Sequence, residues 1–408
     1  MNLTKPTTEP WLTPATYWPQ LSRATAGLDT PFGVVSLPAL AHNAHDMLAR
    51  ANGTTIRVAS KSIRVRGVID AVLTLPGFAG VLAYTLAEAL WLAETIPDVV
   101  VGYPSADRAS IARLASTPAL AQRVTLMIDA VEQLDLVDSV VGAGKREPIR
   151  VALELDAAWR SRVLGYLGVH RSPIRSVEQA TAFAQQVVAR PGFTLVGMMA
   201  YESQIAGLVN RPVGRPVLAR TVDYVQKNST DELRERRGKV VAALRNVTEL
   251  EFVNGGGTGS LERTSADPSV TEIAAGSGLF GPHLFDDYSH FTPAPAAAFS
   301  LSVVRKSQPS MATLLGGGWI ASGPPAPGRL PELTWPRGLE YVARETAGEV
   351  QTPLMGTGAA DLRVGDRVWL RHTKAGELSE HLNEFALVDG EKIVETIPTY
   401  RGEGKAFL

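Results

Sequence analysis

Short apolar runs recur between residues 54 and 275, and amphipathic or polar stretches separate them. Each run is four to seven residues long and is bounded by turn-forming or charged residues, a pattern that predicts buried strands. We therefore expect eight strands, over residues 54–59, 80–85, 99–102, 124–128, 149–155, 194–200, 250–253 and 271–275.

The stretches between several of these runs have the spacing of amphipathic helices. Strands that alternate with helices indicate parallel β/α units, and eight such units predict a closed (β/α)8 barrel of the α/β class. A doubly wound open sheet gives a similar alternation and stays open as an alternative. The predicted helices cover residues 87–94, 106–114, 131–137, 177–188 and 217–244.

The pattern changes near Pro293, after which the chain is strand-like and rich in turns. This change predicts three parts: an N-terminal segment (1–32) associated with a β domain, a barrel (33–292) and an all-β C-terminal domain (293–408). We expect a short strand at 33–36 to join the sheet of the β domain. Strands are also expected near 298–304, 311–315, 367–370 and 385–388, and a proline-rich loop at 322–336.

Composition narrows the function classes. The chain has 408 residues with 40 basic and 41 acidic side chains, so it carries no basic field for nucleic acid. It has no cysteine, which excludes disulfides, thiolate nucleophiles and cysteine-based zinc sites. The N-terminus lacks an apolar signal core, and Asp70, Pro76 and Glu88 interrupt the most apolar region. We expect a soluble cytoplasmic protein with no membrane partner.

Lys61 follows the first predicted barrel strand. A partly desolvated lysine at the mouth of a barrel can attack a carbonyl carbon and form a Schiff base. Taken alone, a lysine at the end of a strand is more commonly a solvated side chain.

Two glycine-rich stretches follow the seventh and eighth predicted strands. Asn254–Ser260 contains Gly256, Gly257, Thr258 and Gly259, and Gly276-Ser277 follows residue 275. Backbone N–H groups in such loops can surround an anion, and the loops after strands seven and eight of a barrel commonly bind phosphate. The spacing matches no dinucleotide or Walker fingerprint, so an ordinary turn is the alternative for each stretch.

Arg171 and Tyr201 lie after the fifth and sixth predicted strands. Arg171 can donate to an anionic oxygen of a cofactor, or it can pair with a carboxylate at the surface. Tyr201 can stack on a planar ligand, or it can cover the core as a rim aromatic.

A polar stretch of the predicted β domain, residues 372–381, contains two histidines and two glutamates. These residue types can hold a metal ion, but their spacing matches no recognised ligand set. A polar loop is the alternative.

Together these stretches resemble the fold-type III pyridoxal-phosphate enzymes, the alanine racemase-like group. The likeness is greater to the D-threonine aldolase and D-serine dehydratase branch, especially to bacterial proteins described as amino-acid deaminase/aldolase. It covers nearly the whole chain. The matching stretches are Ser60-Lys61, Gly168–Pro173, Gly197–Glu202, Gly255–Gly259, Gly276-Ser277 and Gly365–Val368.

The resemblance implies roles for these residues. Lys61 would hold pyridoxal 5'-phosphate as a Schiff base, Arg171 would approach the phenolic oxygen of its ring, and Tyr201 would contact the cofactor, with Lys61 and Tyr201 as the catalytic residues. Gly256–Gly259, Gly276 and Ser277 would cradle its phosphate. That branch often binds a divalent metal through a His-x-Asp or His-x-Cys pair after its Gly-Asp-Arg-Val segment. Gly376–Ser379 stands there instead, so the metal site is unknown.

The implied activity is that of a lyase. A D-β-hydroxy-α-amino acid would be cleaved to glycine and an aldehyde, or converted to a keto acid and ammonia. An amino-acid racemase and a cofactor-binding regulator without turnover are the alternatives; the racemase would need a second base such as Tyr341 or Tyr400. The resemblance also implies a homodimer.

Overall fold

The computed structural model describes residues 1–324 and 326–408, in two compact units. One unit holds the C-terminal β domain, and the other holds the barrel. The first comprises Met1–Asp46, Ser62–Val72 and Ser277–Ala406, and the second Met47–Lys61, Leu73–Gly276 and Phe407–Leu408. The domain boundaries expected at 32/33 and 292/293 stay predictions.

Eight parallel strands close into a barrel in the order β10-β11-β2-β3-β4-β5-β6-β9. All eight predicted strands and the (β/α)8 fold class are confirmed, and the open-sheet alternative is wrong. The strands are β2 (Thr55–Ala59), β3 (Phe78–Ala83), β4 (Val99–Val101), β5 (Val124–Ile128), β6 (Ile149–Glu154), β9 (Phe193–Ala200), β10 (Phe252–Gly255) and β11 (Glu272–Ala275).

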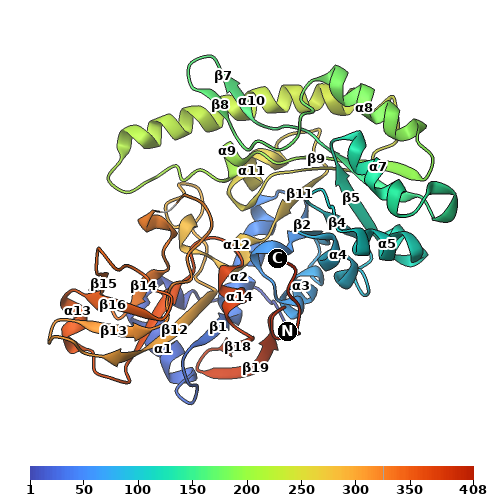
Figure 1. Cartoon of the computed structure of the whole chain (residues 1–408). Helices are drawn as coiled ribbons and strands as arrows, with labels where there is room; N and C mark the ends of the chain where they lie inside the picture. Colours follow the sequence, from blue (N-terminus) through green and yellow to red (C-terminus); the bar gives the residue numbers. More distant parts are fainter. Residues whose placement is uncertain (325) are drawn as a thin grey trace. The chain divides into compact units, whose positions relative to one another are not determined.

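Helices follow the barrel strands (Figure 1), and the five predicted helical segments are confirmed. Side chains satisfy the first backbone N–H groups of several of them. Thr85 accepts the N–H of Glu88 at the start of α4, and Ser176 caps α8. The long α10 packs along α8. The helices are α4 (Leu86–Leu92), α5 (Arg108–Ser116), α6 (Pro118–Arg123), α7 (Val131–Val140), α8 (Val177–Ala189), α9 (Ser203–Ala206), α10 (Pro216–Arg245) and α11 (Leu261–Ser265).

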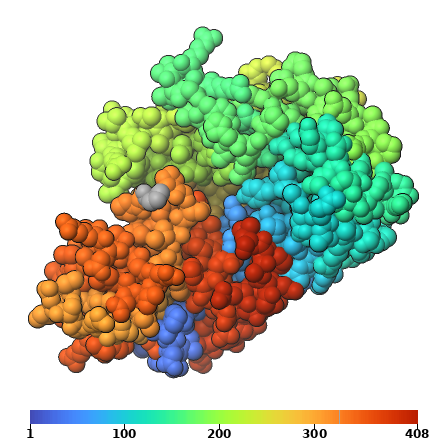
Figure 2. All heavy atoms as spheres, in the orientation of Figure 1, coloured from blue at the N-terminus to red at the C-terminus, as the bar shows by residue number. Residues whose placement is uncertain are grey.

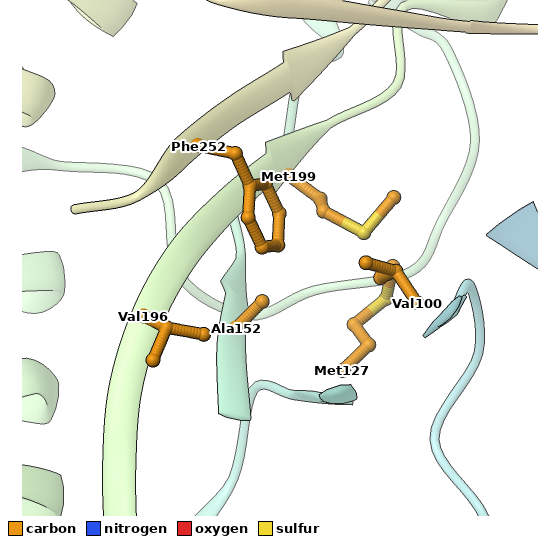
Figure 3. Close-up of a cluster of buried hydrophobic side chains, with 6 residues drawn as sticks. All are labelled: Val100, Met127, Ala152, Val196, Met199 and Phe252. Carbon is orange, nitrogen blue, oxygen red and sulfur yellow. The ribbon is translucent and has the colours of Figure 1, made fainter. Parts of the chain in front are cut away.

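Side chains fill the middle of the barrel. Six of them, from β4, β5, β6, β9 and β10, point toward one another (Figure 3), and all are at most 6% exposed. Burial of each large member stabilises the barrel by about 1.5–3 kcal/mol. The barrel is therefore a packed core, which leaves its carboxyl end to carry chemistry. The six are Val100, Met127, Ala152, Val196, Met199 and Phe252.

A buried ion pair joins β2 to β11. Nε of Arg57 donates to Oε1 of Glu272 at 2.7 Å, and Nη2 donates to Asp98 at 2.8 Å. Asn254 donates to the same Glu272 carboxylate at 2.8 Å. The Arg57 side chain is 3% exposed, so this network ties together strands from both ends of the barrel sequence.

A hairpin that the apolar pattern did not predict lies between β6 and α8. Its strands, β7 (Trp159–Ser161) and β8 (Gly165–Leu167), pair antiparallel, and its tip projects from the surface (Figure 2). Val163 at the tip is 88% exposed. The short, half-exposed strands explain why no buried run marked them in the sequence.

The β domain contains a nine-stranded sheet. The predicted joining of residues 33–36 is confirmed, because β1 (Phe32–Ser36) pairs antiparallel with β12 and parallel with β18. The other strands are β12 (Ala297–Arg305), β13 (Ala312–Leu315), β14 (Glu332–Trp335), β15 (Glu340–Tyr341), β16 (Gln351–Met355), β17 (Arg367–Arg371), β18 (Glu384–Asp389) and β19 (Lys392–Pro398).

The prediction of a continuous loop over 322–336 is wrong in its last part. β14 lies there and pairs antiparallel with β17, a long-range contact that the prolines concealed. Residue 325 lies outside the described residues. The unit that holds the β domain also contains helices, and the last residues of α2 and α3 extend into the other unit. These helices are α1 (Pro14–Ala24), α2 (Leu37–Arg50), α3 (Arg66–Leu73), α12 (Ser277–Phe280), α13 (Thr357–Asp361) and α14 (Glu377–His381).

Over the described part of the chain, none of the helices combines the length and apolar character that crossing a membrane requires.

Candidate active site

Lys61 lies in a short 3-10 helix, Ser60–Ser62, directly after β2. Ser60 is fully buried and donates to the carbonyl of Leu82 at 3.1 Å, which ties this turn to the neighbouring strand β3. The half-buried Lys61 donates from Nζ to the phenolic oxygen of Tyr103 at 3.1 Å. The strand-end position predicted for Lys61 is therefore observed, and its amine has a specific partner.

Tyr103, to which the sequence analysis gave no role, follows β4. Burial acts to raise the pKa of the Tyr103 phenol, but the Lys61 ammonium and the Arg171 guanidinium more than offset this, and the pKa is lowered. Its sequence signal was the same as that of Lys61, a polar residue just past a barrel strand.

Arg171 lies between two aromatic rings. Its guanidinium carbon is 5.2 Å from the ring centroid of Tyr103 and 5.0 Å from that of Tyr201. Nη1 lies 3.7 Å from Oε1 of Glu154. Both interpretations of Arg171 describe part of this arrangement, since it pairs with a carboxylate and also stands among the aromatic side chains of the mouth. The structure therefore brings Lys61, Arg171 and Tyr201 together around Tyr103.

Glu154 ends β6, and its side chain is 5% exposed. Burial raises its pKa to about 7; Arg171 opposes this shift, and Asp129 adds to it. A carboxyl that titrates near neutrality in a site is typical of functional positions. The signal in the sequence was a single carboxyl inside the apolar run 149–155.

The glycine-rich stretch after β10 is tightly packed at Gly256. Gly256 has φ +76°, and a Cβ there would lie 2.7 Å from Cγ2 of Ile273. A Cβ on Gly257 would lie 3.5 Å from Cε2 of Tyr201. Gly257 therefore approaches Tyr201 as bare backbone, and Thr258 and Gly259 follow it in a 3-10 turn.

Buried charged side chains hold the glycine-rich stretch after β10 in place. Glu202, 1% exposed, accepts the N–H of Gly256 at 2.9 Å and the hydroxyl of Thr264 at 2.8 Å. Arg237 lies 3.7 Å from Glu202 and 2.8 Å from Asp267. Glu202 belongs to the predicted Gly197–Glu202 motif, whereas no local signal in the sequence marks Arg237, which stands far along the chain in α10.

Gly276 directly follows β11, which pairs with both β10 and β2. A Cβ at Gly276 would lie 2.2 Å from the carbonyl oxygen of Ala59, two residues before Lys61. Ser277 begins α12 immediately after it. The two predicted glycine segments thus leave neighbouring strands at the same edge of the barrel, next to the strand that carries Lys61.

These residues fit pyridoxal phosphate on two counts. A Cβ would clash at Gly256 and at Gly276, which keeps these two turns free of side chains for a phosphate, and the mouth offers an amine, a guanidinium and aromatic rings. Lys61 is the residue able to hold the aldehyde covalently.

The residues offered as a metal site do not fit a metal. Among residues 1–324 and 326–408, no three or more His, Asp or Glu side chains are grouped to hold an ion. Burial lowers the pKa of His372 to about 4. Glu377 accepts the backbone N–H groups of Lys374 and Ala375 at 2.9 Å, and His381 stacks on Trp319. These side chains serve the packing of the β domain.

The family whose sequence pattern matches is described as "Alanine racemase, N-terminal domain", and the match covers residues 35–283. The chain belongs to this family. Its members typically depend on pyridoxal phosphate. This agrees with the resemblance drawn from the sequence motifs.

Individual relatives are distant. The chain is 26% identical over 268 residues to a 3-hydroxy-D-aspartate aldolase of Paracoccus denitrificans (strain Pd 1222). The aligned part covers 62% of this chain and 60% of that protein. A second aldolase of that name from Paracoccus denitrificans is 28% identical over 259 residues, with the same coverage. The match thus spans about three fifths of the length of these curated relatives.

Two solved structures share the fold of the chain. A D-threonine aldolase from Filomicrobium marinum superposes with a TM-score of 0.74 at 18% identity, over 92% of this chain and 96% of that one. D-threo-3-hydroxyaspartate dehydratase from Delftia sp. HT23 superposes with a TM-score of 0.72 at 18% identity, over 92% and 98%.

Proposed function

We propose that this chain is a pyridoxal-phosphate-dependent lyase that acts on D-β-hydroxy-α-amino acids. The sequence relatives are named as 3-hydroxy-D-aspartate aldolases, and the two fold relatives as an aldolase and a dehydratase of D-configured hydroxy amino acids. All of these names refer to D-configured hydroxy amino acids, which supports the substrate class.

The observation that carries the proposal is the grouping at the barrel mouth. Tyr103 contacts both Lys61 and Arg171 there, and Arg171 also lies against Tyr201, which flanks the bare backbone of Gly257. In the proposal Lys61 holds the cofactor, Arg171 faces the phenolic oxygen of its ring, and Tyr201 contacts the ring. Gly256, Gly257, Thr258, Gly259, Gly276 and Ser277 hold its phosphate.

When bound, pyridoxal phosphate supplies an electron sink for negative charge at the substrate α-carbon. The protein's part is to orient the substrate and to move protons. Lys61 is the candidate base for the α-proton, and the carboxylate of Glu154 keeps Arg171 in place. Two products are then open: glycine with an aldehyde when the Cα–Cβ bond breaks, or a keto acid with ammonia when the β-hydroxyl leaves.

The test is incubation of the purified protein with pyridoxal phosphate and D-threonine, D-serine or D-threo-3-hydroxyaspartate. Glycine, aldehyde, keto acid and the L-enantiomer are each measured, with the L-substrates as matched controls. We expect aldehyde or keto acid from at least one D-substrate. Formation of the L-enantiomer alone would make the chain a racemase, and bound cofactor without any product would make it a regulator; either result contradicts the proposal.

Lys61→Ala tests the role of the lysine separately. Borohydride reduction followed by peptide mass spectrometry is expected to locate the cofactor on Lys61 in the native chain and nowhere in the variant. Full turnover by the variant would contradict the assignment, and so would a reduced cofactor adduct on any other peptide.

We also propose a homodimer, as the family resemblance implies. Sedimentation at low concentration is expected to show the dimer, and a fully active monomer would contradict it.

A further inference from the structure

The hydroxyl of Tyr103 touches the amine on which the proposed function depends. Oη of Tyr103 lies 3.1 Å from Nζ of Lys61. The backbone before it is held firmly, because Gly102 donates its N–H to the carbonyl of Ala83 at 2.8 Å. A Cβ at Gly102 would lie 3.1 Å from Cδ1 of Leu82, so the chain packs closely there. The phenol therefore meets Lys61 from a rigid strand end.

The charges around Tyr103 favour loss of its proton. The titratable groups that face it are the Lys61 amine, the Arg171 guanidinium over its ring, and the Tyr201 phenol. The two cations outweigh burial, and the pKa of Tyr103 is lowered. The Tyr103 phenol can therefore release its proton closer to neutral pH than a tyrosine in water, whose pKa is about 10, and the resulting phenolate can accept a proton.

We propose that Tyr103 is a further catalytic residue, whose phenolic oxygen exchanges a proton with the amine of Lys61. This rests on the proposed function, in which Lys61 is the reacting amine. An N–H bond of the Lys61 ammonium breaks and an O–H bond forms on the Tyr103 phenolate. Both charges are neutralised, no other reactant is needed, and a lone pair is left on Nζ. That lone pair can bond to a carbonyl carbon or take a proton, and the reverse transfer restores the ammonium.

The test measures how fast the full-length chain, stripped of cofactor, forms its visible lysine–cofactor absorbance after addition of pyridoxal 5'-phosphate, from about pH 6 to about pH 10. Tyr103→Phe keeps the ring against Arg171 and removes only the hydroxyl. We expect its rate at pH 7 to fall roughly a hundredfold and to approach the native rate near pH 10, where hydroxide can replace the phenolate as proton acceptor. Tyr103→His restores a proton acceptor and is expected to regain about tenfold of the rate at pH 7.

Tyr224→Phe is the matched control, because Tyr224 lies half-exposed on α10, and its rate should equal the native rate at every pH. A Tyr103→Phe rate equal to the native rate, or lowered by the same factor at all pH values, would overturn the proposal, as would failure of histidine to rescue. These outcomes differ from failure of the proposed function itself, in which the native chain forms no lysine-bound cofactor at any pH.

Discussion

The carboxylate of Glu202 accepts the backbone N–H of Gly256 at 2.9 Å. Glu202 follows β9 and Gly256 follows the neighbouring strand β10, so one buried charge connects two strand ends. The same carboxylate lies 3.7 Å from Arg237 of α10. The proposed phosphate cradle is thus held by a strand end and a helix, in addition to the bond that Gly257 donates to Ser260 within the loop.

Glu202→Gln should weaken this support. The amide keeps the size of the side chain but removes the negative charge, so Arg237 keeps Asp267 as its remaining carboxylate among these contacts. Loss of hydrogen bonds to a buried charged group costs about 2 kcal/mol. We expect urea unfolding to show that loss and the dissociation constant of pyridoxal phosphate to rise at least tenfold. Glu235→Gln, an exposed position on α10, should change neither value.

Gly276→Ala should be destabilising. The new Cβ would lie 2.2 Å from the carbonyl oxygen of Ala59, a backbone atom that cannot swing away. Overpacking of this kind costs about 1–3 kcal/mol, and displacement of Ala59 would also move Lys61. The matched control is Gly238→Ala in α10, where a Cβ meets nothing within 4 Å and should stabilise the helix by about 1 kcal/mol. Equal melting temperatures for the two variants would contradict the prediction.

Arg57→Met should lower the free energy of unfolding, because it leaves a buried carboxylate without its partner. Glu272 would lose its buried partner, and breaking such a pair costs about 3–5 kcal/mol. The double variant Arg57→Met/Glu272→Leu should recover much of that loss, because both charges are gone. Arg113→Met removes an exposed pair with Glu94 and should cost less than about 1 kcal/mol. Chemical unfolding of the native chain and these three variants gives the comparison, and a double variant that is no more stable than Arg57→Met would contradict the prediction.

The raised pKa of Glu154 predicts that the stability of the fold depends on pH. Its pKa is raised in the folded chain from 4.5 to about 7, so the folded state favours the protonated form. The stabilisation is complete below about pH 4.5 and is lost as the pH rises through about 7, by roughly 3 kcal/mol in all. Glu154→Gln cannot ionise, so without cofactor its unfolding free energy should gain on that of the native chain between pH 5 and pH 8. A difference that stays constant over this range would refute the shifted titration.

Chelation should leave the protein unchanged, because the His and Glu side chains of residues 372–381 pack within the β domain rather than grouping as ligands. We expect equal melting temperatures and equal turnover of the D-substrates before and after dialysis against a chelator. Addition of manganese to the dialysed protein is the control. Loss of activity that manganese restores would show that ligands are recruited in a way these side chains do not suggest.

The barrel was predictable because its signals are local. Each strand is a short apolar run, and the polar residues that follow a parallel strand gather at one edge, which is how Lys61 and Tyr201 were found. Tyr103 and Glu202 were not identified because their roles depend on which partner stands opposite. The contact of Tyr103 with Lys61 exists only once β2, β3 and β4 lie side by side. β14 was missed for a similar reason, since its partner β17 lies far along the chain.

The order in which the strands are synthesised delays the pairing of β1. β1 leaves the ribosome before any barrel strand, whereas its two neighbours, β12 and β18, are made after all eight. The nascent chain therefore carries an apolar strand with both edges open throughout translation of the barrel. An open edge of this kind can pair with other chains, so the growing polypeptide needs protection until the last strands of the β domain emerge.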